Sequence, residues 1–313
     1  MPQRPQVILP RTPILRGVPE LQTVMVFRTR PDKEWTDRGM ALAMRAFGVR
    51  GDLRNSSLQK GLSTAKRGDS YAEAYEVSGG TFCADLSRLW PVLSPDQIRR
   101  VKTRALQRNV VLEVANQFVR ELGALPKEPT RAIYLPDEIY FQRGEGEVQR
   151  HVIAAAVEYR RSAEGIQVGG PGGKLKVYFD TQGEPAGLLR TMRVIEPYRK
   201  LRIHPASRVL AEIRKGPIRR QLLLGIRSVE IAQMKLIYYE GPPDQNQHFL
   251  QPAYRVTGVA HGRAGDRSFT VPYCEYVPAL VDALEPMFPK GDVIKPKQRK
   301  APRSSPQWGK DDE

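Results

Sequence analysis

The sequence is poor in cysteine, with only Cys83 and Cys274 among its 313 residues. Two cysteines this far apart form neither a disulfide framework nor a zinc site of the usual spacing. We interpret them as two small, semi-buried thiols. A single long-range disulfide between them is the alternative.

Long apolar runs are also absent, because no stretch reaches the roughly 18 apolar residues that a membrane-spanning helix needs. The sequence therefore predicts no transmembrane segment. A signal peptide needs about 7–15 uninterrupted apolar residues, whereas the apolar stretch at residues 7–9 ends at Pro10 and Arg11. We expect a cytoplasmic protein, or an extracytoplasmic one if the chain is a processed form.

The sequence contains no linear catalytic or metal-binding motif. Its four histidines lack the spacing of zinc ligands and have no neighbouring cysteine. The segment 169–174 resembles a phosphate-binding loop, but Leu175 stands where that loop needs serine or threonine. We predict a hairpin turn there, no cofactor, no metal and no enzymatic activity. An active site assembled only in space stays open.

What the sequence has in excess is positive charge, with a formal net charge of +16. Half of the excess lies between Arg190 and Arg220, while residues 225–288 carry a net charge of −2. An anionic partner is the usual reason for such a charge, and arginine suits bidentate contacts to carboxylates or phosphates. The candidate partner-binding residues of this segment are Arg190, Arg193, Arg199, Lys200, Arg202, Arg208, Arg214, Lys215, Arg219 and Arg220.

Both ends of the chain are rich in proline. Residues 1–20 contain five prolines and no periodicity, which predicts an extended arm. Residues 289–313 alternate proline with lysine and arginine, which predicts a basic tail that buries little apolar surface. The tail adds four candidate partner-binding residues: Lys295, Lys297, Arg299 and Lys300.

Between the tails, helical periodicity alternates with strand patterns and glycine-rich turns. Caps and apolar stripes predict helices over residues 33–47, 94–122 and 204–215. This order predicts an α+β fold of two to three units, each an amphipathic helix packed on an antiparallel β-meander. The expected division is an arm at 1–20, α+β units at 21–93, 94–200 and 201–288, and a tail at 289–313.

One segment resembles a known family. Gly165-Ile166-Gln167-Val168-Gly169-Gly170 and Asp180-Thr181-Gln182-Gly183 stand where the central hairpin of PepSY-type domains has its two turns, "Gly-Ile-Pro-Val-x-Gly" and "Asp-x-x-Gly". These domains include the fungalysin/thermolysin propeptide modules. Gln167 departs from the commoner proline.

A second resemblance covers the C-terminal strands. Leu236-Ile237-Tyr238-Tyr239 and the segment 250–258 are similar to regulatory domains of extracytoplasmic sensor-associated proteins. Together the two resemblances imply a non-enzymatic module that binds, inhibits or regulates a protein. They transfer no catalytic residues.

Charge and resemblance together predict a protein-binding regulatory, assembly or structural component that docks an acidic protein surface within a larger complex or homo-oligomer. RNA or DNA binding through the same basic segment and tail is the alternative. Tyr198 is the only aromatic residue of the basic segment, so the sequence shows no platform on which bases would stack. No zinc finger or RNP motif occurs either.

Overall fold

The computed structural model of the chain describes residues 6–8, 21–57, 59–91, 93–94, 97–98, 101, 104–141, 149–215 and 225–288. Of the described residues, 51% are in strands and 18% in helices. The strands form one large mixed sheet of 15 strands. The predicted α+β fold, with a helix packed on each of several β-meanders, is therefore wrong.

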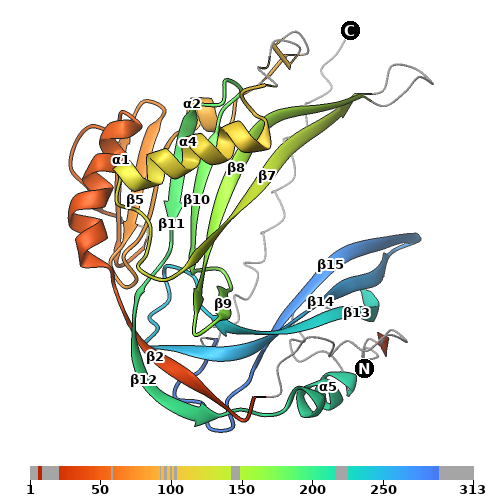
Figure 1. Cartoon of the computed structure of the whole chain (residues 1–313). Helices are drawn as coiled ribbons and strands as arrows, with labels where there is room; N and C mark the ends of the chain where they lie inside the picture. Colours follow the sequence, from red (N-terminus) through yellow and green to blue (C-terminus); the bar gives the residue numbers. More distant parts are fainter. Residues whose placement is uncertain are drawn as a thin grey trace, which may run out of the picture.

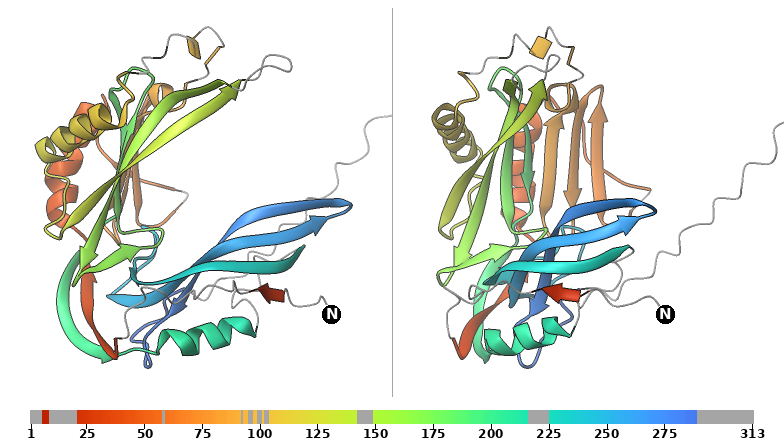
Figure 2. Two further views of the ribbon diagram at one scale, coloured as in Figure 1. Left: turned by 45° about the vertical axis from the view of Figure 1, so that its right-hand side comes forward. Right: turned by 90° about the vertical axis from the view of Figure 1, so that its right-hand side faces the viewer.

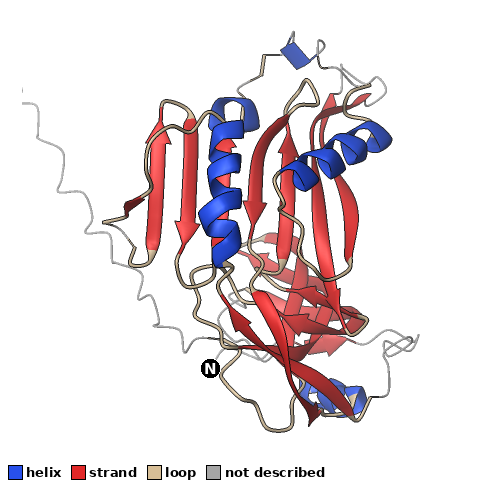
Figure 3. Cartoon of the chain, turned by 60° about the vertical axis from the view of Figure 1, so that its left-hand side comes forward, coloured by secondary structure: helices blue, strands red, loops and turns tan. Residues whose placement is uncertain are grey.

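One part of the sheet carries helices on one face, as Figures 1 and 3 show. We call this part the helix-backed sheet. The helical turn η1 (Trp35–Gly39) continues into α1 (Met40–Ala46), and α4 (Arg108–Glu121) covers the neighbouring strands, while the short α2 (Leu86–Leu89) follows one strand. The strands, in spatial order, are β3 (Arg54–Asn55), β4 (Leu62–Arg67), β5 (Ser70–Tyr75), β6 (Gly80–Asp85), β11 (Pro185–Arg190), β10 (Lys174–Phe179), β8 (Gln149–Ala163) and β7 (Thr130–Phe141).

The other part is built from long antiparallel strands, with α5 (Ala206–Arg214) on one face (Figure 1). We call it the hairpin sheet. One of its strands, β1, is parallel to its neighbour and comes from the predicted extended arm. The strands are β15 (Arg267–Pro278), β14 (Phe249–Ala264), β13 (Ile226–Tyr239), β1 (Gln6–Ile8), β2 (Thr23–Arg30) and β12 (Val194–Arg202).

The strand β9 (Ile166–Gly169) joins the two parts, because it is antiparallel to β8 and parallel to β13. The turn from β8 to β9 consists of Glu164 and Gly165, with φ of 48° and 73°. Two successive positive φ values define the tight turn that matches the twist of antiparallel strands. From this junction the two parts of the sheet diverge, so that the molecule has the outline of an open V (Figure 2).

The fold prediction failed because strands of different predicted units pair with one another. β6 of the first unit pairs with β11 of the second, β2 pairs with β12, and β9 pairs with β13 of the third. Such pairings join residues that are 70 to 179 positions apart in the sequence, and no local pattern records them. The periodicity that predicts a strand does not predict its neighbour.

The helices themselves were largely predicted. η1 with α1, and α5, fall within the predicted ranges 33–47 and 204–215, which confirms those two helices. The predicted helix 94–122 contains α4 but begins too early, because Gln107 is extended, with ψ of 144°, and starts a new helix. Among the described residues, no helix is long and apolar enough to cross a membrane.

Each part of the sheet has its own core. Apolar residues of η1, α1 and α4 pack on the helix-backed sheet, where Val111, Ala115 and Val119 of α4 are fully buried. Val209 and Ile213 of α5 pack on the hairpin sheet with residues of β2, β13 and β14. The stripe spacing of both helices follows from the helical repeat of 3.6 residues per turn.

The segment 169–173 connects β9 to β10 and packs on the end of β13. The predicted hairpin turn is wrong, because these two strands are not paired with each other: β9 pairs with β8 and β13, and β10 pairs with β8 and β11. The backbone N–H of Gly172 donates to the carbonyl of Glu240 over 3.1 Å, and that of Gly173 donates to Thr191 over 2.8 Å. A Cβ atom at position 172 would overlap the carbonyl oxygen of Gly241. Glycine is therefore required here because backbone approaches backbone, which is a packing reason and not a phosphate-binding one.

We expect Gly172→Ala to lower the free energy of unfolding by about 3 kcal/mol, because the added methyl group meets an immobile carbonyl. The matched control is Gly169→Ala in the same turn, where the nearest atom is the flexible end of Ile237, 3.1 Å away. That variant should lose less than about 1 kcal/mol. Urea denaturation measures both, and equal losses would contradict the steric explanation.

Candidate functional site

Two of the predicted partner-binding residues are not on the surface. Arg190 and Arg193 are 3% and 1% exposed. The sequence interpretation of these two arginines as docking residues is therefore wrong. A guanidinium at the end of a strand that enters the core is surrounded by protein, and charge patterns along the chain do not distinguish it from an exposed one.

Arg190 ties three segments together. It forms an ion pair with Asp32 over 2.6 Å, donates to the carbonyl of Ala124 over 2.9 Å, and lies over the Trp35 ring at 4.9 Å. The Trp35 ring in turn packs against Gly39, which has no side chain to block it. Arg190 thus fixes the end of β2 and the start of η1 against the helix-backed sheet.

Glu240, at the end of β13, is the centre of a second buried cluster and is 0% exposed. Its carboxylate accepts from the side chain of Arg161 over 2.7 Å and from the backbone N–H of Arg193 over 2.9 Å. The Arg193 guanidinium lies 3.5 Å from the same carboxylate and also donates to the carbonyl of Gln245 over 2.6 Å. This cluster links β8, β12 and the end of β13.

Burial disfavours the charged form of these arginines. It lowers the pKa of Arg190 and of Arg193, while Asp32 and Glu240, respectively, oppose the shift. Repulsion from Arg161 lowers both pKa values further. The Nε–H groups of Arg161 and Arg193 are buried without an acceptor among the described residues. With Glu128, which lies 3.4 Å from Arg161, three carboxylates contact the three arginines, and two buried N–H donors are left without an acceptor within the described ranges.

A cavity of about 660 Å³ opens beside these arginines, where β2, η1, the end of α4 and the start of β12 meet. We call it the junction cavity. Trp35, Gly39 and Leu122 contribute apolar wall. Its basic lining residues are Arg30, Arg38, Arg120, Lys127, Arg161, Arg190 and Arg193, and its acidic ones are Asp32, Glu34, Glu121, Glu128 and Glu196.

The basic residues of β12 lie at the edge of the sheet, since β2 is its only partner among the described strands. Arg199 and Arg28 of β2 both lie over the Tyr198 ring, at 5.1 and 4.7 Å from its centroid. The same ring packs against Phe249 at 5.3 Å. We call Arg28, Tyr198 and Arg199 the arginine–tyrosine cluster. Both arginines are exposed, and neither pairs with an acid in the described part of the chain.

The remaining predicted residues have different positions. Lys200 and Arg202 are exposed, and the register places them on the other face of β12 from Arg199. Arg208, Arg214 and Lys215 are exposed on or just after α5, where Lys215 pairs with Glu212 over 2.7 Å. Arg219, Arg220, Lys295, Lys297, Arg299 and Lys300 lie outside the described residues.

Sequence reasoning missed residues that complete the arginine–tyrosine cluster and the buried cluster around Glu240. Arg28 and Phe249 reach Tyr198 from β2 and β14, and Arg161 reaches Glu240 from 79 residues away. One signal was present, because Glu240 directly follows the apolar strand end Ile237-Tyr238-Tyr239. A carboxylate placed there needs a buried partner, but nothing in the sequence says which arginine supplies it.

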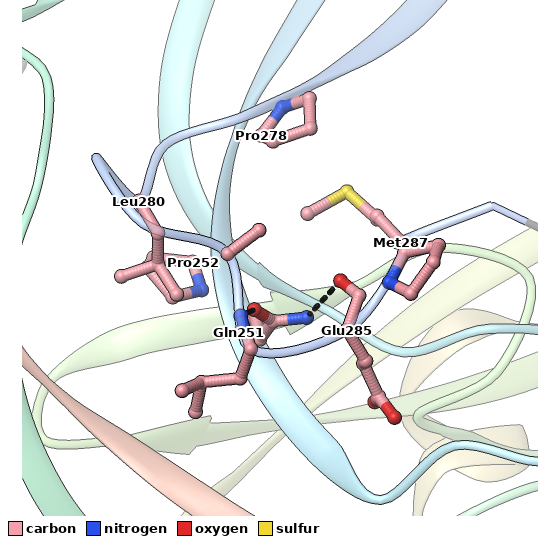
Figure 4. A pocket seen from close by; sticks show the side chains of 9 residues that line it. Gln251, Pro252, Pro278, Leu280, Glu285 and Met287 are labelled. Carbon is pink, nitrogen blue, oxygen red and sulfur yellow. Dashed lines mark hydrogen bonds between the residues drawn. The ribbon is translucent and has the colours of Figure 1, made fainter.

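A separate, apolar pocket of about 370 Å³ lies between β14 and the segment that follows β15 (Figure 4). The side chain of Gln251 donates to the backbone carbonyl of Glu285 over 3.0 Å and accepts from the N–H of Leu284 over 2.9 Å. The Glu285 carboxylate accepts from the backbone N–H of Phe249 over 2.8 Å. These polar groups hold the segment onto β14, so the pocket is a feature of packing.

The two cysteines are not paired, which excludes the long-range disulfide. Cys83 is buried beside Met40, and burial raises the pKa of its thiol to about 12. Cys274 is exposed on β15. Among the described residues, no group of three or more histidine, cysteine, aspartate or glutamate side chains is arranged to hold a metal ion.

No protein-family model matches the chain, and no curated protein matches it. Among solved structures, an uncharacterized protein from Eubacterium rectale ATCC 33656 is similar, with 11% identity over 83% of this chain and 85% of that chain and a TM-score of 0.49. Because the identity is this low, the function has to be argued from the residues of the chain itself.

We expect Glu240→Gln to lower the free energy of unfolding by about 3–5 kcal/mol, because it leaves the buried guanidinium of Arg193 with no charged partner and that of Arg161 with only Glu128, 3.4 Å away. The control is Glu196→Gln, which breaks the ion pair of Glu196 with Arg30, where both side chains are 58% exposed. That change should cost less than about 1 kcal/mol. Thermal and chemical denaturation of the two variants compare them, and similar losses would refute the central role of Glu240.

The reactivity of the two thiols tests the burial of Cys83. Since the pKa of the Cys83 thiol is about 12, almost none of it is thiolate at pH 8. We expect Ellman's reagent to label one thiol per folded chain and two per unfolded chain. In Cys274→Ser, the folded chain should then show none. Rapid labelling of folded Cys274→Ser would mean that Cys83 is accessible.

Proposed function

We propose that this protein is a non-enzymatic binding protein, a regulatory or assembly component, which docks an acidic protein surface through the arginine–tyrosine cluster. The single observation that carries the proposal is the pair of exposed guanidiniums, Arg28 and Arg199, over one tyrosine ring. Tyrosine and arginine are enriched among the few residues that carry most of the binding energy of protein interfaces.

The cluster is suited to carboxylates. An arginine that lies over an aromatic ring keeps its N–H donors free at the edge of the guanidinium, and loses less side-chain entropy on binding because the ring already orients it. The Phe249 ring packs against the Tyr198 ring. Arg208 and Arg214 of α5 are exposed basic residues as well.

An acidic protein fits better than a nucleic acid. Base recognition by stacking needs a free aromatic face, and here two guanidiniums already occupy positions over the Tyr198 ring. The neighbouring ring, that of Phe249, is tilted by 47° to the Tyr198 ring, so the two do not form a parallel stacking surface. Carboxylates, in contrast, need only the outward-facing donors of Arg28 and Arg199.

The partner is expected to bind side chains and not to extend the sheet. β12 carries Pro197, which has no N–H to donate, and its register with β2 shifts between Pro197 and Arg199. Proline, a bulge and charged side chains are the devices by which natural sheets prevent another strand from pairing with their edge. The partner is therefore an acidic surface, not an added strand.

The test compares two variants with the same loss of charge, Arg28→Gln/Arg199→Gln and Arg108→Gln/Arg131→Gln. The second pair is exposed on the helix-backed sheet and on α4, away from the cluster. Tagged full-length chains are used to purify partners from the source cells, with and without nuclease, and the captured protein is then titrated in purified form. We expect the first variant to bind about 30-fold more weakly, on the order of 2 kcal/mol, and the second to bind normally.

Two outcomes would overturn the proposal. If the captured material disappears after nuclease treatment, the chain binds RNA or DNA, and affinity for nucleic acid should then fall steeply with salt concentration. If both variants bind the purified partner equally well, the arginine–tyrosine cluster is not the docking surface. Because the residues are exposed, both variants should unfold within about 0.5 kcal/mol of the unaltered chain, so misfolding does not explain a loss.

A further inference from the structure

The junction cavity has a wall of buried positive charge. Arg161, Arg190 and Arg193 are each at least 97% buried, whereas Glu240 is the only carboxylate of the cluster that is buried to the same degree. The other two acids that contact these arginines keep part of their hydration, since the side chains of Asp32 and Glu128 are 16% and 21% exposed. Partly hydrated acids offset buried charge less effectively.

Arg161 is also close enough to repel the other two guanidiniums. Arg161 lowers the pKa of both Arg190 and Arg193, which means that each of them would gain from a further negative charge nearby. The buried Nε–H groups of Arg161 and Arg193 add positive potential that no acceptor in the described part of the chain compensates. The wall of the cavity therefore favours an anion.

Exposed basic side chains line the mouth of the cavity. Arg38 of η1, Arg120 of α4 and Lys127 after α4 line it and are exposed. Among the described residues, none of the three forms an ion pair with an acid. They come from three different segments and border the same space, so a bound anion could be contacted from several sides at once.

The space matches a small molecule. At about 660 Å³ the junction cavity lies within the range of roughly 300–1,000 Å³ that is usual for ligand sites. Its lining combines the apolar surface of Trp35 and Leu122 with an excess of two positive charges. Oxygen anions such as phosphates and carboxylates match the paired donors of arginine in geometry as well as in charge.

We infer that the junction cavity is a binding site for a small multivalent oxyanion, a phosphate- or carboxylate-bearing metabolite, held by Arg38, Arg120 and Lys127 at its mouth against the buried arginine wall. Such a ligand contacts η1 and α4 on one side and the start of β12 on the other. It therefore bridges the helix-backed sheet and the strand that leads into the hairpin sheet. This site has no residue in common with the arginine–tyrosine cluster.

The experiment uses the full chain, with inorganic pyrophosphate and citrate as probes and sodium chloride at matched ionic strength as the reference. Calorimetry and thermal unfolding measure binding. The location is read from Trp35 in a Trp90→Phe/Trp308→Phe background, where Trp35 is the only tryptophan left. We expect saturable binding of at least one probe with one site per chain and a change in Trp35 emission. Comparison of the two probes shows whether phosphates or carboxylates are preferred.

The decisive comparison removes three charges in each of two places. In Arg38→Gln/Arg120→Gln/Lys127→Gln, the affinity for the bound probe should fall at least tenfold. In Arg208→Gln/Arg214→Gln/Lys215→Gln, on α5, it should be unchanged. The inference is overturned if neither probe binds at millimolar concentration, if sodium chloride reproduces the effect, or if both triple variants bind alike. Because all six residues are exposed, both triple variants should fold. Binding of the protein partner through Arg28 and Arg199 is measured separately, so that failure of the proposed function is distinguished from failure of this inference.

Discussion

The architecture depends on one buried carboxylate, that of Glu240. It binds Arg161 of β8 and the backbone of Arg193 at the start of β12, while the backbone of Glu240 itself pairs with Gly169 and Gly172. Four segments from both parts of the sheet therefore meet at one residue at the end of β13. The glycines of the turn are a consequence, because side chains there would occupy the space of Glu240 and Gly241.

A buried ion pair contributes little net stability to a protein, since the desolvation of its charges offsets most of their attraction. The ion pair matters here because its hydrogen bonds have a fixed direction. Apolar contacts tolerate a shift in position, whereas a carboxylate that accepts from Arg161 and from the N–H of Arg193 has one acceptable geometry. The cluster thus fixes how the helix-backed sheet meets the hairpin sheet. Arg190, with Asp32 and Trp35, does the same for the entry into η1.

The sequence predicted local features well and distant ones poorly. The helices around Trp35 and Val209 depend on neighbouring residues, and they were predicted. The hairpin turn predicted at Gly169 depends on which strands pair, and it was not found. The pairing of β6 with β11 and of β2 with β12 depends on contacts that only the folded chain creates, so the fold class was predicted wrongly. The same limit applies to charge. Arg190 and Arg199 look alike in the sequence, but one is buried beside Asp32 and the other is exposed over Tyr198.

The two candidate sites share one strand. Val194, Ile195 and Glu196 line the junction cavity, and Tyr198 and Arg199 follow on the same β12. Glu196 is also the register partner of Arg28 on β2, and Arg30, which lines the cavity, lies two residues from Arg28. Residues directly opposite on paired strands are closer than the screening length of roughly 8 Å at physiological ionic strength. A charge bound at one site therefore acts directly on the other, and the pairing of β12 with β2, which is least regular at the register shift beside Pro197, adds a mechanical route.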